Sequence, residues 1–360
     1  MKLIAQVKLL PTQGQAGALC RTLQRVNSAA NHVSARAWED RVFRYYELRK
    51  RTYYEVRQRF DLTAQAAIQC IGKVAQAYKR DRKTQRSFRP YGAIAYDDRI
   101  LSWRLADQTL SIWTIDGRER IPLVAGERQL ERLASRQGES DLVYRDGASY
   151  LLATCNVEEP PAVAVDEFLG VDLGITNIAA DSDGENYSSR HLNGLRKRHR
   201  RLRQRLQRKR TKSARRLLKK RRHKESRFAQ DVNHGIAKRI VGKAEGTGRG
   251  IALEDLKGIR ERITVGKRQR SQHHSWAFHD LRAKIEYKAR LRGVPVVLVN
   301  PKDTSRTCPV CGCVDKQNRS TQSVFSCVSC GFSAHADTVA ARNIARRAAV
   351  NRPDAAGLTA

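Results

Sequence analysis

Two closely spaced pairs of cysteines in the last fifth of the chain have the spacing of a metal site. Cys308 and Cys311 form one Cys-x-x-Cys pair, and Cys327 and Cys330 form a second pair after fifteen intervening residues. Each pair is expected on a tight turn that points both sulfurs at one ion, as in a tetrahedral zinc site. Because four thiolates leave no open position for a substrate, we predict one structural Zn²⁺. The neighbouring Cys313 is a spare thiol that could substitute as a ligand.

Three acidic residues lie in or beside apolar segments, where a lone charge is costly to bury. Asp172 lies in "LGVDLGIT", Glu254 ends "IALE", and Asp337 precedes the helical pattern "TVAARNIARRAA". Each of them alone could be a structural acid with a satisfied partner. If they converge, they could hold two Mg²⁺, which would clamp the attacking water and the leaving oxygen in phosphodiester hydrolysis. Asp255 would point to the other side of its strand, so we expect it at the surface.

The charge balance favours a polyanionic partner, most simply nucleic acid. The formal net charge is +34, from 70 Lys and Arg against 36 Asp and Glu in 360 residues. Residues 196–224 contain 18 Lys or Arg and no acid. Such a run is usually a solvated face, but this one lies between predicted strands of one domain. We therefore interpret it as an internal arm that binds nucleic acid, because its like charges would otherwise repel one another.

The sequence "TKS" at 211–213 predicts a break between two helices of this arm. Their apolar seam would be thin, formed by Leu202, Leu206, Leu217 and Leu218. The candidate nucleic-acid contacts in the arm are Arg196, Lys197, Arg200, Arg201, Arg203, Arg208, Lys209, Arg210, Arg215, Arg216, Lys219 and Lys220.

The first 160 residues are predicted to combine strands with a helical insertion. "KLIAQVKLL" alternates as a strand does, and Thr12 with Gln15 has the spacing of a helix capping box. About three helices follow, the third starting at the cap candidate Asp61. Residues 87–157 are rich in Ile, Trp and Tyr and predict strands, including a hairpin that turns at Asp146-Gly147. We expect these strands to close with the first strand into a barrel.

The remaining residues predict a mixed α/β sheet, because apolar strands alternate with helices. After the boundary signal "EEPPAV", the chain is expected to form strand, turn and strand, with Asp181 and Asp183 as turn residues. "GRGIALE" and "VPVVLVNP" predict two buried strands, with a helix from about Trp276 to Arg292 between them. No stretch has the length of a membrane span and no secretory signal is recognisable, so we expect a cytoplasmic protein.

An ordered set of motifs in this chain resembles one protein family. In order, "GVDLGITNIAADSDG", "IALEDLKG", "TSRTCPVCG…FSCVSCG" and "HADTVAARNIARR" resemble the RuvC-like nuclease motifs and zinc ribbon of TnpB proteins. These are transposon-encoded, RNA-guided DNA endonucleases related to type V CRISPR effectors. The opening "KLLPTQGQAGAL" also looks like the family's first strand and helix. One departure is His335-Ala336-Asp337, where many members have Asp-Arg-Asp; the final aspartate is kept.

The resemblance implies a role for each of these residues. Asp172, Glu254 and Asp337 would form the catalytic triad and bind the two Mg²⁺, and the four paired cysteines would be the zinc ligands. The partners would be a guide RNA and a double-stranded DNA target with a short flanking motif that the protein reads. The implied fold is α/β with an α+β N-terminal lobe. Its parts would be a wedge β-barrel (1–10 and 86–160), a helical recognition domain (11–85), an RNase H-like, RuvC-like domain (165–303) with its basic arm (190–245), a zinc ribbon (304–332), the end of the RuvC-like domain (333–349) and a tail (350–360).

The sequence therefore predicts a metal-dependent, RNA-guided DNA endonuclease of a transposable element. Three alternatives stay open at this point: a transposase that joins strands with the same carboxylates, a guide-dependent DNA-binding regulator, and a compact type V CRISPR effector. The chain could act as a monomer or a homodimer.

Overall fold

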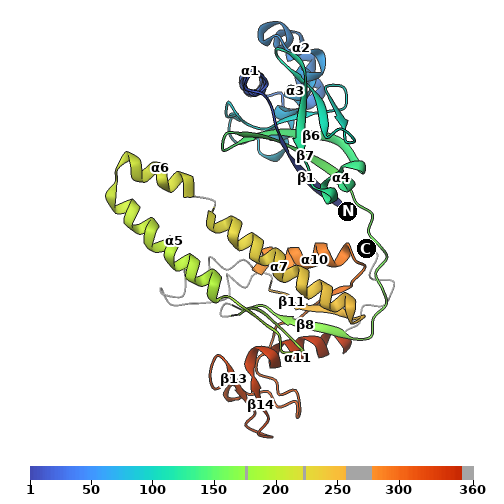
Figure 1. Cartoon of the computed structure of the whole chain (residues 1–360), viewed down its shortest axis with the longest axis vertical. Helices are drawn as coiled ribbons and strands as arrows, with labels where there is room; N and C mark the ends of the chain where they lie inside the picture. Colours follow the sequence, from blue (N-terminus) through green and yellow to red (C-terminus); the bar gives the residue numbers. More distant parts are fainter. Residues whose placement is uncertain (175–176, 222–223, 257–277, 351–360) are drawn as a thin grey trace. The chain divides into compact units, whose positions relative to one another are not determined.

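The computed structural model describes residues 1–174, 177–221, 224–256 and 278–350 (Figure 1). The chain forms two compact units, residues 1–158 and 159–360. They divide at the start of the proline-containing segment 158–163. Each unit has its own apolar core, so each is described separately below.

The first unit is built on a curved sheet of seven strands in the order β2-β6-β7-β1-β5-β4-β3. The two edge strands are only four residues apart in the chain, so the sheet must curl to bring its edges together. The Tyr96 hydroxyl of β2 donates to the Trp113 carbonyl of β4 at 3.0 Å, which joins the two ends into a nearly closed barrel. The elements are β1 (Lys2–Leu9), β2 (Ile94–Tyr96), β3 (Leu101–Arg104), β4 (Thr109–Thr114), β5 (Gly117–Val124), α4 (Glu127–Ala134), β6 (Arg136–Arg145) and β7 (Ala148–Asn156).

This sheet agrees with the barrel expected from the sequence. The first strand lies in its middle and pairs antiparallel with both β7 and β5. The hairpin between β6 and β7 turns at Asp146 and Gly147, which both have positive φ (50° and 83°), as the two-residue turn requires.

Three helices are inserted between β1 and β2: α1 (Gln13–Glu39), α2 (Tyr45–Phe60) and α3 (Ala64–Arg80). The capping box predicted for α1 is present, since Thr12 and Gln15 exchange side-chain and backbone hydrogen bonds. The predicted start of the third helix at Asp61 is wrong. Asp61 ends α2 in the left-handed conformation (φ 50°), and Thr63 precedes α3. An aspartate tolerates that conformation as well as it caps a helix start, which explains the error.

The second unit contains a mixed sheet of five strands in the order β10-β9-β8-β11-β12. β8, β11 and β12 are parallel, whereas β9 and β10 are antiparallel to their neighbours. The mixed sheet is as predicted, but the first part contains three strands rather than two. The strands are β8 (Phe168–Asp172), β9 (Asn177–Asp181), β10 (Asn186–Ser188), β11 (Gly250–Glu254) and β12 (Val296–Val299).

Helices cover both faces of this sheet (Figure 1). α7 (Lys224–Gly246) and α10 (Phe278–Arg290) pack on one face, where Ile240 and Ile285 meet Val171. α11 (Ala336–Val350) packs on the other face, where Ile344 meets Phe168. The first residues of the helix predicted from Trp276 lie outside the described residues.

Gly170 allows α11 to lie unusually close to β8. A Cβ at this position would sit 2.0 Å from the carbonyl oxygen of Ala341 and 2.7 Å from the backbone nitrogen of Ala345. Because only glycine lacks that atom, the sequence permits this approach at Gly170 in the middle of the strand.

The basic arm is a helical pair, α5 (Arg190–Lys209) and α6 (Lys212–Arg221). The predicted break is present: Arg210 has φ 50°, and the Thr211 hydroxyl accepts from the backbone nitrogen of Ala214. The seam is even thinner than predicted, because Leu206 and Ala214 are buried whereas Leu217 is exposed.

Between β12 and α11 the chain forms a small cysteine-rich segment. It contains a short 3₁₀ helix (Lys316–Asn318) and a hairpin of β13 (Val324–Ser326) and β14 (Ser333–His335). Phe325 is fully buried there, with Cys308, Cys327 and Val339 of α11 in the same apolar cluster. The segment is therefore packed onto the start of α11. Among the described residues, no helix is both long enough and apolar enough to cross a bilayer.

Candidate active site and metal centre

Asp172 and Glu254 lie side by side at one edge of the second sheet. They end the neighbouring parallel strands β8 and β11, whose register pairs Val171 with Leu253. Parallel strands bring their carboxyl ends to the same edge, where ligand sites of such sheets form. Both side chains share the face of Gly170 and Ala252, which is the face that α11 covers.

Asp337 reaches the same place from α11, whose first turn contains it. The proximity of the three carboxylates is visible in their electrostatics. Burial, together with the charges of Glu254 and Asp337, raises the pKa of Asp172 to about 8. Burial also raises the pKa of Glu254, which is only 9% exposed. Three acids distant in sequence thus form one cluster in which negative charge is crowded and desolvated.

Glu254 is held by residues that sequence reasoning missed. The Thr304 hydroxyl donates to Oε1 of Glu254 at 2.5 Å. Asn343 of α11 in turn donates to the carbonyls of Thr304 and Thr307, both at 2.8 Å. The helix that contains Asp337 therefore also positions the loop that holds Glu254.

Asp337 has two polar neighbours, each from a different element. The Asn177 side-chain amide, at the start of β9, donates to Oδ2 at 2.9 Å. Arg319, from the cysteine-rich segment, lies 3.4 Å from Oδ1. The Arg319 charge also opposes the rise in the pKa of Asp172 and of Glu254. It therefore supplies part of the positive charge that this acidic cluster requires.

Asp255 lies away from the cluster, as the strand alternation predicted. Its carboxylate accepts from Arg282 of α10 at 3.0 Å and is about half exposed. Asp255 is therefore a neighbour of Glu254 in sequence but not a member of the acidic cluster.

The four paired cysteines form the tightest group of potential metal ligands among the described residues. Their sulfurs all lie within 4.8 Å of one another. The separations of 3.6 Å (Cys308 to Cys330) and 3.5 Å (Cys311 to Cys327) are too long for disulfides. The donor set fits one tetrahedral zinc ion. In the described part of the chain, the three carboxylates do not reach that tightness.

The two cysteine turns have the expected backbone. Gly312 and Gly331 both have φ 74°, and each backbone nitrogen donates to the carbonyl of the first cysteine of its pair. Cys313 is half-buried beside the cluster, and its carbonyl accepts from the Cys308 nitrogen at 2.9 Å.

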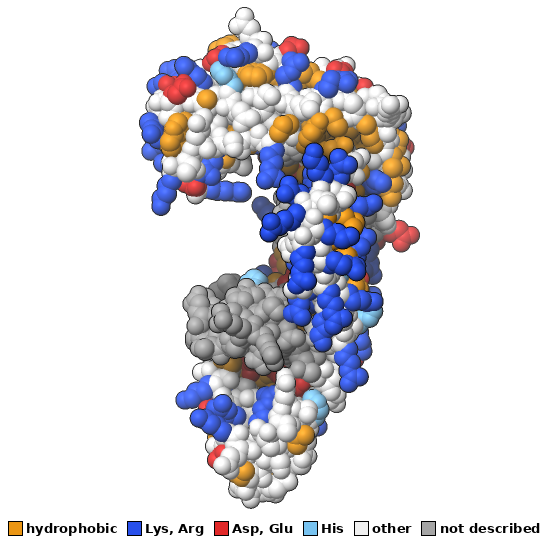
Figure 2. All heavy atoms as spheres, turned by 90° about the vertical axis from the view of Figure 1, so that its left-hand side faces the viewer, with side chains coloured by type: hydrophobic (Ala, Val, Ile, Leu, Met, Phe, Trp, Pro, Cys, Tyr) orange, Lys and Arg blue, Asp and Glu red, His pale blue; other side chains and the backbone are white. Residues whose placement is uncertain are grey.

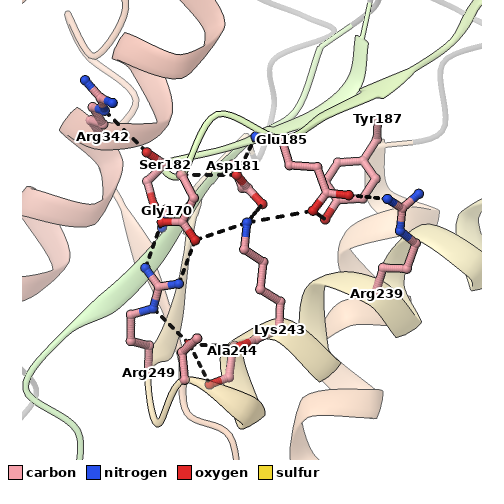
Figure 3. Close-up of polar contacts among 12 residues, drawn as sticks. Gly170, Asp181, Ser182, Glu185, Tyr187, Arg239, Lys243, Ala244, Arg249 and Arg342 are labelled. Carbon is pink, nitrogen blue, oxygen red and sulfur yellow. Dashed lines mark hydrogen bonds and ion pairs between the residues drawn. The ribbon is translucent and has the colours of Figure 1, made fainter.

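The turn after β9 is more than local turn chemistry. Asp181 is fully buried and accepts from the backbone nitrogens of Asp183 and Glu185, as a turn residue does. The Asp181 carboxylate also pairs with Lys243 of α7 at 2.6 Å (Figure 3). Arg249 donates hydrogen bonds to both carboxylate oxygens of Asp183. These basic partners were not predicted, because they lie about sixty residues further along the chain.

The same turn contacts the elements of the acidic cluster. Ser182 exchanges hydrogen bonds with the backbone of Gly170 in β8, and its carbonyl accepts from Arg342 of α11 at 3.3 Å (Figure 3). The turn therefore connects β8, the strand that ends at Asp172, with α7 and α11.

The helices α5 and α6 present a strongly basic face (Figure 2). Of the twelve candidate contacts, Arg196 is half-buried and the other eleven are exposed. Arg203 forms an ion pair with Glu225 of α7 at 3.2 Å, which fixes the arm to the next helix. The remaining charge faces solvent, where a polyanion could reach it.

Two family models match most of the second unit. Residues 153–257, which include Asp172, Glu254 and the arm, match a model described as a probable transposase, OrfB_IS605. Residues 278–344, which include Asp337 and all four paired cysteines, match the Cas12f1-like TNB domain. Over about a third of its length, the chain is homologous to a protein named TnpB-like. The resemblance predicted from the sequence is thereby confirmed.

Several curated relatives are similar to parts of this chain. A CRISPR-associated endodeoxyribonuclease Cas12f1 of Syntrophomonas palmitatica is 38% identical over 122 residues, which are 34% of this chain and 24% of that protein. The TnpB-like protein MJ0751 of Methanocaldococcus jannaschii is 35% identical over 132 residues, 36% of this chain and 47% of that protein. A putative RNA-guided DNA endonuclease of Streptomyces pristinaespiralis is 28% identical over 74% of this chain and 63% of that protein. The similarity thus spans between a quarter and two thirds of these relatives.

A solved structure shares the fold over a longer span. The chain matches the protein of a Cas12f1–sgRNA–target DNA complex with a TM-score of 0.57 and 14% identity. The match covers 91% of this chain and 82% of that one. At this identity the likeness concerns the fold alone, which is that of a Cas12f effector.

Proposed function

We propose that this protein is an RNA-guided DNA endonuclease of a transposable element, with Asp172, Glu254 and Asp337 as its catalytic residues. The observation that carries the proposal is the meeting of these acids at one sheet edge, where burial, together with the charges of Glu254 and Asp337, raises the pKa of Asp172 to about 8. The second unit would then be an RNase H-like, RuvC-like domain, and the segment 304–332 its zinc ribbon.

The donor set of the acidic cluster fits divalent cations. Crowded, partly buried carboxylates are the ligands that Mg²⁺ takes, and a cation would offset their repulsion. Bound there, two Mg²⁺ would supply a Lewis acid for the phosphate and a route to hydroxide at neutral pH. The chain's own residues orient the carboxylates: Thr304 holds one oxygen of Glu254, and Asn177 holds one oxygen of Asp337.

Guide RNA and double-stranded target DNA would be the partners. The net charge of +34 and the exposed basic face of α5 and α6 support this part of the proposal. Guide–target pairing would select the sequence, whereas the protein would read a short flanking motif. Under this proposal, residues 1–10 and 86–160 form the wedge barrel, and residues 11–85 form the recognition domain.

The direct experiment is to purify the protein, sequence the RNA that copurifies, and offer a DNA that matches the RNA's variable end. We expect one discrete RNA species and cleavage that requires both this RNA and Mg²⁺, with 5′ phosphate and 3′ hydroxyl ends. Cleavage that is equally efficient without RNA would overturn the proposal.

A second candidate function is strand transfer, because residues 153–257 match a model described as a probable transposase. The same carboxylates could catalyse either reaction, so the products decide between them. Joined DNA strands that form without added RNA would favour the transposase and exclude the guided nuclease.

The zinc assignment has its own test. In a Cys313→Ser background, which removes the spare thiol, we expect Cys327→Ser to lower the zinc content measured by mass spectrometry of metals from one ion per chain to near zero, because a three-sulfur remnant binds weakly. Cys313→Ser is the matched control and should keep the ion. Equal zinc content in both variants would contradict the assignment.

A further inference from the structure

The first unit contains a groove that is not part of the acidic cluster, the cysteine cluster or the basic arm. It lies between α3 and the outer face of strands β1, β2, β6 and β7, and its volume is about 460 Å³. This volume exceeds what a nucleobase needs, and all the residues that line the groove belong to the first unit.

The floor of the groove is apolar, although it is the solvent side of the sheet. Ile4 is 65% exposed, on a strand whose other outward residues are polar. Leu152 and Ala95 continue the floor on β7 and β2, and both pair in register with Asp141 of β6. A lone exposed isoleucine is ordinary, but here Ile4 and Leu152 are diagonal neighbours on β1 and β7 and form a small apolar patch beside the Asp141 carboxylate. An apolar patch with a few polar groups around it is typical of a ligand site.

The walls offer both donors and acceptors of hydrogen bonds. Gln69, Lys73 and Gln76 project from α3, and Glu139 and Asp141 stand on β6. Lys73 is fixed there, because its Nζ donates to Asn27 at 2.5 Å and to the Ala93 carbonyl at 2.8 Å. Burial lowers the pKa of Lys73 to about 8, so this wall is poorly solvated.

This chemistry suits the edge of a base rather than a phosphate. Glutamine amides pair with the donor and acceptor edge of adenine, and a carboxylate accepts from the amino groups of bases. Phosphate sites use arginine forks or clustered cations, but this lining contains two lysines, two acids and no arginine. The groove is therefore nearly neutral in a chain whose net charge is +34.

We propose that this groove binds an unpaired nucleobase, which packs its face against Ile4 and Leu152 and presents its edge to Gln76 and Asp141. The base would come from the guide RNA or from the target DNA, so this inference rests on the proposed function. Apolar contact with the face of a base is a sequence-tolerant source of affinity, whereas the carboxylate of Asp141 would favour bases with an amino group.

The test uses the full chain, freed of copurified RNA, and four single-stranded octamers as probes: cytidine and uridine with ribose, and deoxycytidine and thymidine with deoxyribose. Binding is measured by fluorescence anisotropy at about 0.3 M salt, which weakens phosphate contacts elsewhere. We expect Ile4→Thr to weaken cytidine-octamer binding about fivefold, because a hydroxyl replaces part of the apolar surface that the base would cover. Val124→Thr is the matched control, because Val124 is an exposed strand residue (51%) outside the groove, and it should change nothing.

A second variant separates a binding role from a structural one. Asp141→Asn should lower the preference for cytidine over thymidine or uridine octamers, because an asparagine also offers donors to the edge that it meets. Tighter binding of ribose octamers would assign the base to the guide, and tighter binding of deoxyribose octamers to the target. Equal behaviour of Ile4→Thr and Val124→Thr, or an unchanged base preference in Asp141→Asn, would overturn the inference. Neither assay needs a guide or cleavage, so failure here is distinct from failure of the proposed function.

Discussion

Asp183 shows at the scale of one residue how basic partners stabilise an acid in this fold. Arg249 donates to both of its carboxylate oxygens at 2.9 and 2.7 Å, and Lys243 lies 3.0 Å from one of them. The Arg249 guanidinium, aided by Lys243, holds the pKa of Asp183 well below its usual value. The acid therefore binds fewer protons in the folded state than in the unfolded state.

A pH dependence follows from this direction. An acid whose pKa falls on folding stabilises the protein above its unfolded pKa, about 4, and loses that contribution as the pH falls further. We expect Asp183→Asn to lower the midpoint of thermal unfolding at about pH 6, and the difference from wild type to shrink by about pH 3. Asp107→Asn, which removes the well-exposed pair with Arg120, is the control and should have little effect. A pH-independent deficit in Asp183→Asn would contradict this account.

The residues of the proposed sites could be selected from the sequence where a local pattern marks them. The cysteines are identified by their spacing, and Asp172 and Glu254 by the apolar residues around them. Their supports were not predictable. Asn177 is 160 residues from Asp337, and Thr304 is 50 residues from Glu254. A lone polar residue acquires such a role only when the fold brings its partner near, and no local pattern records that.

At the scale of elements, the placement of Asp337 depends on how closely α11 packs on β8. Gly170 is the point of closest approach. We expect Gly170→Ala to destabilise the protein by roughly 1–3 kcal/mol, because the added methyl meets backbone that cannot swing away. The same variant should reduce cleavage more than binding of DNA, since α11 contains Asp337. Denaturation with urea and a cleavage assay would measure the two effects.

Gly235→Ala is the control for that substitution. Gly235 lies within α7, and a Cβ there would meet open space. Alanine in a helix interior is more favourable than glycine by up to about 1 kcal/mol, so this variant should be at least as stable as wild type. If Gly170→Ala matched it, the close packing of α11 would not position the site.

Elements defined by neighbouring residues were predicted well, and those that depend on distant ones were not. The capping box of α1, the Asp146-Gly147 hairpin and the break at Thr211 are all as predicted, because each is set within a few residues. The start of α3 was misassigned, since Asp61 suits a helix end as well as a helix start. The division of the first predicted strand into the antiparallel strands β8 and β9 was missed, because "FLGVD" and "NIAAD" are apolar enough to suggest one continuous strand.

At the scale of the whole molecule, the charge distribution should govern how the protein binds RNA. We expect the triple variant Arg208→Gln, Arg215→Gln, Lys219→Gln to weaken RNA binding. The slope of log affinity against log salt concentration should become less steep by roughly 2, because a protein that makes fewer phosphate contacts releases fewer counterions when it binds. Filter binding across a series of salt concentrations would measure it.

The control for this variant removes the same charge elsewhere. Arg104, Arg128 and Arg145 are exposed residues of the first unit, and their replacement by glutamine changes the net charge equally. A slope that falls equally in both triple variants would show that net charge, rather than the arm, governs binding. Composition predicted a polyanionic partner, and the basic run at 196–224 predicted the arm; the structure adds that eleven of its twelve candidate contacts are exposed along α5 and α6.

The central claim is that Asp172, Glu254 and Asp337 together cleave guided DNA. The most direct measurement compares two neighbouring acids, Glu254→Gln and Asp255→Asn, in a cleavage assay with copurified RNA and matching DNA. Glu254 faces the cluster, whereas Asp255 pairs with Arg282 away from it. The account predicts that Glu254→Gln abolishes cleavage but retains RNA-dependent DNA binding, and that Asp255→Asn cleaves at nearly the wild-type rate. Cleavage by Glu254→Gln at the rate of Asp255→Asn would contradict it.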